Sequence, residues 1–123
     1  MSAIDRSKNR IDKTGEVFTP PELSKEILDS IPDIYFTDVA KTICEPSVGE
    51  GVFLTEILRR RLHSGNGATE SLRTLYGVDL MYDNVQVCRQ NLLDLAGDTK
   101  QNRAIVNQNI VHANSLEYDF AFA

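Results

Sequence analysis

Residues 45–54 read Glu-Pro-Ser-Val-Gly-Glu-Gly-Val-Phe-Leu, and this stretch is the most informative one about the fold. Gly49 and Gly51 stand one residue apart, so the backbone there can turn sharply and approach a ligand without a clash from a Cβ atom. Residues 41–46, before the turn, indicate a short buried strand that a proline closes. Residues 52–62, after the turn, carry apolar side chains at helical spacing. The stretch therefore predicts a strand, a tight turn and a helix.

The same alternation continues on both sides of this unit. The other predicted elements are strands at 75–79 and 109–114, a helix at 82–96 that Gly97 ends, a helix that begins near Thr19 and ends at Pro32, and a surface loop at 63–70. Strands that alternate with helices favour a parallel sheet with right-handed crossovers. The predicted fold class is α/β, with about three parallel strands and flanking helices.

Composition indicates one cytoplasmic domain. The chain has 123 residues, of which 41% are hydrophobic and 25% are charged. No run approaches the ~20 apolar residues that span a bilayer, and the charged N-terminus has no apolar segment behind it to act as a secretory signal. We expect residues 1–13 to be a flexible arm and residues 14–123 to form the domain. Cys44 and Cys88 are too few for a disulfide framework and are predicted to be small core residues.

The charge balance argues against a protein that binds DNA by itself. Thirteen Lys and Arg residues against eighteen Asp and Glu residues give a net charge of −5. Domains that hold nucleic acid alone are usually basic, because neutralising phosphates supplies much of their affinity. The basic triplet 59–61 closes a helical pattern, and we interpret it as favourable charge at a helix C-terminus rather than as a phosphate contact.

Polar residues that suit a nucleoside follow the three predicted strands, where a parallel sheet binds its ligands. Glu45 precedes the glycine turn, and its carboxylate would repel phosphate but suits an ammonium or hydroxyl group. Asp79 can accept hydrogen bonds from ribose hydroxyls, Leu80 can pack on adenine, and the Asn114 amide can pair with the adenine edge. Taken singly, Asp79 could instead cap the next helix, and Asn114 could be a turn residue. Together they predict a pocket for S-adenosylmethionine (SAM).

Four segments, in order along the chain, resemble the motifs of N6-adenine-specific DNA methyltransferases. Residues 14–21, Thr-Gly-Glu-Val-Phe-Thr-Pro-Pro, are similar to the N-terminal cofactor motif of that family, and residues 45–54 are similar to its main SAM motif. Residues 76–80 resemble its acidic-strand motif, and residues 109–116 resemble the motif on its third strand. The resemblance covers most of the chain. It implies the N-terminal, cofactor-binding part of a Rossmann-like SAM-dependent methyltransferase fold.

The resemblance also implies a role for each matching residue. It implies that Phe18, Thr19 and Pro20 close over the cofactor. Its methionine part would contact Glu45, Pro46, Gly49 and Gly51. Asp79 would bind the ribose hydroxyls, Leu80 would lie on the adenine face, and Asn114 would bind the adenine amine. Asn114 stands where the family usually has aspartate. Its amide still accepts a hydrogen bond but carries no charge, so we expect a lower affinity for the cofactor.

The catalytic motif of the family, Asn-Pro-Pro-Tyr or Asp-Pro-Pro-Tyr, is not in this sequence, whose one Pro-Pro pair is at 20–21. In the family that motif holds the flipped adenine. We therefore predict no catalytic residue, no activity of the chain alone, and contact with DNA only through a separate catalytic or recognition part. About three of seven expected strands are present, and a half-sheet leaves an exposed edge. Self-association or pairing with a partner chain is expected there.

Two other functions stay open on the sequence. The chain could be an inactive, truncated methyltransferase that acts as a SAM-binding, regulatory or decoy subunit. It could also be part of a SAM-dependent enzyme for RNA or protein, which the acidic charge favours and residues 14–21 oppose. A nicotinamide dehydrogenase is excluded, because the turn lacks a third glycine at the due spacing and places Glu45 and Glu50 where a pyrophosphate would lie.

Overall fold

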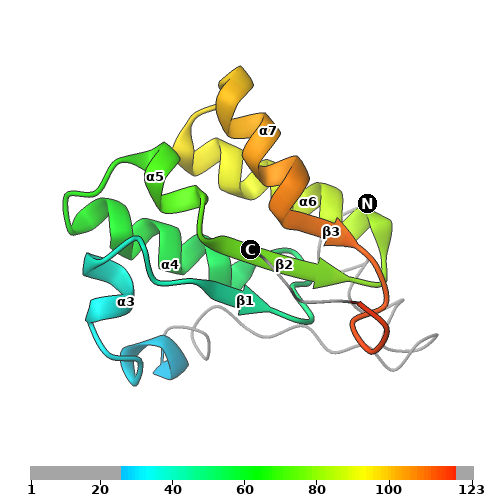
Figure 1. Ribbon diagram of the computed structural model, residues 1–123, viewed down its shortest axis with the longest axis horizontal. Helices are drawn as coiled ribbons and strands as arrows, with labels where there is room; N and C mark the ends of the chain where they lie inside the picture. The colour runs from blue at the N-terminus through cyan, green and yellow to red at the C-terminus, as the bar shows by residue number, and fades with distance from the viewer. Residues whose placement is uncertain (1–25, 119–123) are drawn as a thin grey trace.

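A three-stranded parallel sheet with helices packed on it forms this structure, a computed structural model that describes residues 26–118 (Figure 1). Residues 26–29 are helical and come first. The elements that follow are α3 (Ile34–Thr37), β1 (Ile43–Glu45), α4 (Val52–His63), α5 (Ala68–Leu72), β2 (Leu75–Asp79), α6 (Tyr82–Ala96), α7 (Lys100–Asn109) and β3 (Ile110–His112).

The sheet has the strand order β1-β2-β3, and both pairings are parallel. Glu45 at the end of β1 is in register with Gly77, and Asp79 at the end of β2 is in register with His112. The central strand β2 is buried along most of its length, as expected for a strand with neighbours on both sides. The predicted α/β class with three parallel strands is confirmed.

Helices α4 and α6 connect the strands and pack against each other, and α7 packs on α6 (Figure 1). Their inward faces supply much of the core, for example Leu54 and Leu58 from α4 and Val85 and Leu92 from α6, each at most 1% exposed. Burying a side chain of this kind contributes roughly 1.5–3 kcal/mol. Helix α6 has the bounds that its apolar spacing predicts, and α4 begins where the glycine turn ends.

Helix α7 was not predicted, because half of its buried face is asparagine. Its buried residues are Asn102, Ile105, Val106 and Asn109, which stand at helical spacing although only two of them are apolar. The Asn102 side chain accepts a hydrogen bond from Thr69 (2.8 Å) and donates one to the Gly97 carbonyl (3.0 Å). Two buried amides that find partners in neighbouring segments therefore replace the apolar contacts by which a helix is usually recognised.

The predicted loop at 63–70 is partly wrong, since α5 begins at Ala68. The outer strands are shorter than predicted. β1 covers only Ile43–Glu45, because the following Pro46 has no N–H to extend the ladder. β3 starts at Ile110 because Asn109 still belongs to α7.

Arg61 has a role beyond the favourable charge that the basic triplet 59–61 was predicted to bring to the end of a helix. Its side chain is 0% exposed, although it lies in the last turn of α4. The guanidinium donates hydrogen bonds to four acceptors, which are the carbonyls of Tyr35 (3.1 Å), Ser71 (2.9 Å) and Lys41 (2.6 Å) and the hydroxyl of Thr74 (2.7 Å). Arg61 is therefore an internal clamp that ties the chain before β1 to the chain before β2. Arg59 and Arg60 instead form ion pairs with Glu56 on the surface.

The two cysteines are free thiols with different environments. Cys88 is fully buried, as predicted, and burial raises the pKa of its thiol to about 12. Cys44, on β1, is only half-buried. No helix among residues 26–118 is long and apolar enough to cross a membrane.

Candidate functional site

The carboxyl ends of the three strands meet at one edge of the sheet, the side to which the arrows point in Figure 1. Glu45 ends β1, Asp79 ends β2, and Asn114 follows β3 by two residues. The Val48 N–H donates to the Val78 carbonyl (2.9 Å), so the glycine turn folds back onto β2. The structure thus places Glu45, Asp79 and Asn114 at the same ends of neighbouring strands.

Gly49 and Gly51 both have positive φ angles, 56° and 84°, which L-residues rarely adopt. Gly51 is also in close contact with α6, because a Cβ built on it would lie 2.5 Å from the Cys88 sulfur. Gly51 sits at the N-cap position of α4, where no side chain caps the helix. The turn therefore needs glycine for its backbone conformation and, at Gly51, also for the packing of α4 on α6.

Asp79 is the centre of the site. It is 5% exposed, and its carboxylate accepts three hydrogen bonds. Oδ2 accepts from the Gly49 N–H (2.9 Å), while Oδ1 accepts from the Met81 N–H (2.8 Å) and the Asn84 amide (3.1 Å). Its carbonyl accepts from the Ala113 N–H (3.0 Å). One residue thus joins the glycine turn, the start of α6 and the segment after β3.

Glu45, at the end of β1, is half-buried. Its Oε1 accepts a hydrogen bond from the Ser47 N–H (3.2 Å). Burial raises the pKa of this carboxyl above its ordinary value, and the Ser47 hydrogen bond offsets part of that effect. The burial favours a partner that carries positive charge, because such a partner would stabilise the ionised form.

Replacing Glu45 with glutamine is expected to stabilise the protein more at pH 7 than at pH 4. The raised folded-state pKa means that Glu45 contributes most below its unfolded pKa, and that this contribution is lost as pH rises through the folded pKa. The gain in Tm from glutamine should therefore be larger at pH 7 than at pH 4. Thermal unfolding of both proteins at the two pH values measures it. An equal Tm difference at both values would contradict the assignment.

An exposed apolar rim lies next to Asp79. Leu80 is 63% exposed and Tyr82 is 51% exposed, which is unusual for large apolar side chains beside a buried strand. The Tyr82 ring lies 5.4 Å from the His112 ring, and a His112 ring nitrogen lies 2.9 Å from the Leu80 carbonyl. The Asn114 Oδ1 accepts a hydrogen bond from the Leu116 N–H (3.0 Å), so this residue also shapes a turn.

Sequence reasoning missed Tyr82, Asn84 and His112 at this site. No periodicity singles them out, since Asn84 reads as an ordinary helix residue and His112 as an ordinary strand residue. Phe18, Thr19 and Pro20, and with them the predicted start of the first helix near Thr19, lie outside the described residues. Pro46 follows β1 and is exposed.

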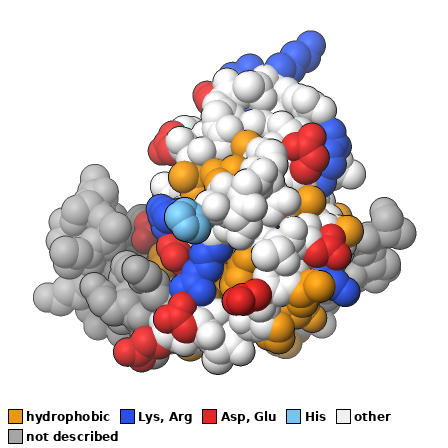
Figure 2. All heavy atoms as spheres, turned by 90° about the vertical axis from the view of Figure 1, so that its left-hand side faces the viewer, with side chains coloured by type: hydrophobic (Ala, Val, Ile, Leu, Met, Phe, Trp, Pro, Cys, Tyr) orange, Lys and Arg blue, Asp and Glu red, His pale blue; other side chains and the backbone are white. Residues whose placement is uncertain are grey.

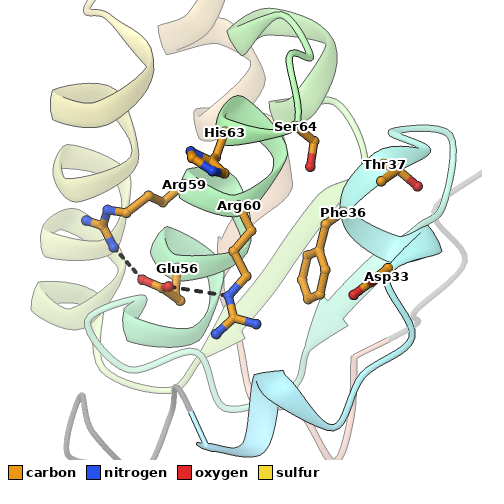
Figure 3. A pocket seen from close by; sticks show the side chains of 8 residues that line it. All are labelled: Asp33, Phe36, Thr37, Glu56, Arg59, Arg60, His63 and Ser64. Atoms are coloured by element: carbon orange, nitrogen blue, oxygen red, sulfur yellow. Dashed lines mark hydrogen bonds and ion pairs between the residues drawn. The ribbon is translucent and has the colours of Figure 1, made fainter.

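A hollow of about 460 Å³ lies between α3 and the C-terminal half of α4, near the opposite end of the sheet (Figures 1 and 3). Its lining mixes both signs of charge, and Figure 2 shows acidic and basic side chains interspersed on this face. Glu56 pairs with Arg59 and Arg60, and the Arg60 guanidinium lies 5.3 Å from the centre of the Phe36 ring. Glu56, Arg59 and Arg60 already pair with one another, and none of the residues that line this hollow is a predicted site residue. Residues 26–118 contain no cluster of His, Cys, Asp and Glu side chains that could hold a metal ion.

Three parallel strands with a glycine turn after the first and a buried aspartate after the second define a partial Rossmann-like methyltransferase fold. Residues 5–122 match the family described as N-6 DNA Methylase, and the chain belongs to this SAM-dependent family. The chain is also similar to the type II methyltransferase M.VspI of Vibrio sp. (strain 343), with 28% identity over 97 residues. The matched region is 78% of this chain and 21% of M.VspI, so the chain spans about a fifth of that relative's length. No solved structure matches the chain.

Proposed function

We propose that this chain is the SAM-binding portion of a DNA adenine-N6 methyltransferase, which transfers a methyl group from SAM to adenine in DNA when the enzyme is complete. The observation that carries the proposal is the meeting of the glycine turn and Asp79 at the carboxyl edge of the sheet, where the Gly49 N–H and Oδ2 are 2.9 Å apart. Membership in the N-6 DNA Methylase family and the similarity to M.VspI support it.

The donors and acceptors at the edge fit the parts of SAM. Asp79 offers a carboxylate, the preferred acceptor for two ribose hydroxyls. Glu45 offers a negative charge to the ammonium of the methionine part, and the glycine turn leaves its backbone open to close approach. Leu80 and Tyr82 present apolar surface to the adenine, and the Asn114 amide can accept from its amine.

In the complete enzyme, SAM would supply an electrophilic methyl group for the adenine amine. The residues of this chain hold and orient that group without donating or removing a proton. The contribution of this chain to catalysis would then be to place the reacting atoms in line, which lowers the activation free energy by several kcal/mol. The groups that hold the target adenine would belong to a part of the enzyme outside this chain.

Because a carboxylate has about four lone-pair positions and Asp79 already accepts three hydrogen bonds, it cannot bind two ribose hydroxyls in its present arrangement. The Gly49 N–H is the donor most easily displaced, since it belongs to a turn rather than to a helix. Cofactor binding should therefore move the glycine turn away from Asp79.

Calorimetric titration with SAM tests the proposal. We expect wild-type protein to bind SAM and the Asp79→Ala variant to lose about 10- to 100-fold in affinity, the equivalent of one or two charge-assisted hydrogen bonds. Asp98→Ala is a matched control, because Asp98 is an exposed aspartate whose partner, Arg103, lies on the surface. A folded wild type that does not bind SAM, or equal affinities for all three proteins, would contradict the proposal.

A non-catalytic role as a partner subunit is the second candidate, and the position of β1 favours it. Among the described strands β1 pairs only with β2, so its other edge has no strand beside it. An edge strand of this kind is a template for pairing with another chain. We propose that this edge takes a strand from a second copy or from a chain that completes the sheet. Sedimentation velocity at high concentration should show association, and a sharp monomer peak would count against it.

A further inference from the structure

Asn84 is fully buried, although asparagine is usually exposed on helices, and it lies in the first turn of α6. Its amide donates to Oδ1 of Asp79 over 3.1 Å, and the same oxygen accepts from the Met81 N–H at 2.8 Å. Both donors come from the start of α6, whereas Oδ2 accepts from the Gly49 N–H of the turn. The two carboxylate oxygens of Asp79 therefore have different partners, one in the helix and one in the turn.

We propose that Asn84 is a positioning residue, which holds the Asp79 carboxylate so that Oδ2 faces the ligand side and can accept from the ribose hydroxyls of the cofactor. This inference rests on the proposed function. It adds the residue that sets how strongly the site distinguishes a ribose from a sugar without hydroxyls.

The chemistry of the amide explains why asparagine suits this position. An aspartate side chain has two rotatable bonds. Once the Gly49 N–H has left Oδ2, the Met81 N–H fixes the other oxygen without fixing the plane of the carboxylate. A second donor from Asn84 fixes that plane. Because an amide is neutral, it orients the carboxylate without forming an ion pair, and the negative charge stays available to strengthen hydrogen bonds from the ribose. A lysine or arginine in its place would compete with the ribose for that charge.

The test measures selectivity rather than affinity alone. Calorimetry gives the affinity of each protein for S-adenosylhomocysteine and for its 2′,3′-dideoxy analogue, and the ratio of the two affinities reports the contacts to the ribose hydroxyls. We expect wild-type protein to prefer the hydroxylated ligand at least tenfold, and Asn84→Ala to lose most of that preference. Asn84→Leu, which is close in size to asparagine and has no side-chain donor, should lose the preference too.

Asn109→Ala is the matched control. Asn109 is also a buried helical asparagine, but its amide donates to the carbonyls of Leu72 and Arg73, away from Asp79. It should lower stability and leave the ratio unchanged. If Asn84→Ala does not fold, Asn84→Leu decides the question.

The outcomes separate the two proposals. If wild-type protein binds neither ligand, the proposed function fails and this inference fails with it. If wild-type protein binds both ligands equally, the proposed function stands and this inference fails. If wild-type protein shows the preference and the folded Asn84 variants keep it, the proposed function stands and Asn84 is only a structural residue.

Discussion

Replacing Arg61 with methionine is expected to lower the free energy of unfolding by about 3 kcal/mol or more. The variant keeps most of the apolar stem but leaves four buried acceptors without their donor, among them the carbonyls of Tyr35 and Lys41. Each unsatisfied buried acceptor costs about 1–3 kcal/mol before the structure relaxes. For a domain of this size, a loss of 3 kcal/mol is a large part of the total stability.

Urea unfolding measures the effect, and Arg59→Met is its control. Arg59 lies two positions earlier on the same helix, its side chain is 57% exposed, and it forms a surface ion pair with Glu56. Removing such a pair should change stability by about 0.5 kcal/mol or less. If Arg61→Met and Arg59→Met unfold at the same urea concentration, Arg61 is not the internal clamp described above.

The Gly51→Ala substitution is expected to destabilise the protein by about 2–4 kcal/mol, for two separable reasons. The backbone at Gly51 has a φ of 84°, where an L-residue costs about 1–2 kcal/mol. The new Cβ would also lie 2.5 Å from the Cys88 sulfur, so α4 and α6 would have to move apart. Overpacking of this kind adds about 1–3 kcal/mol.

Gly65→Ala separates these two causes. Gly65 has a similar φ of 95°, but a Cβ built there would meet no atom within 4 Å. The Gly65→Ala variant should therefore lose only the stability that the backbone strain costs. The difference between the two variants in chemical denaturation gives the loss of unfolding free energy that the clash with Cys88 causes. Adding Cys88→Ala to Gly51→Ala should recover at least about 1 kcal/mol, since it removes the sulfur from the contact. Equal losses for Gly51→Ala and Gly65→Ala would contradict the close packing at the turn.

The parts of the fold that could be predicted are those in which apolar side chains carry the pattern. Helix α6 presents Val85, Cys88 and Leu92 inward at helical spacing, so its sequence already shows its buried face. Helix α7 buries Asn102 and Asn109 at the equivalent positions, and their partners come from distant segments of the chain. Polar residues that are buried through long-range hydrogen bonds give no local signal.

The same reason explains which site residues could be predicted. Asp79 follows an apolar strand directly, so its position at the sheet edge can be read from its neighbours. Asn84 matters only because α6 places its amide 3.1 Å from the Asp79 carboxylate. For Arg61 the sequence pattern predicts only favourable charge at a helix C-terminus, and only the fold shows that four acceptors surround it.

We propose that SAM binds at the carboxyl ends of the three strands rather than in the hollow between α3 and α4. Amide nuclear magnetic resonance spectra recorded during a SAM titration test the position of this binding site, because the shift of each amide reports changes in its own surroundings. We predict the largest shifts at Gly49, whose N–H must leave Asp79, with further shifts at Gly51, Leu80 and Asn114. Shifts confined to residues such as Phe36 and His63 in the hollow, or no shifts at saturating SAM, would contradict it.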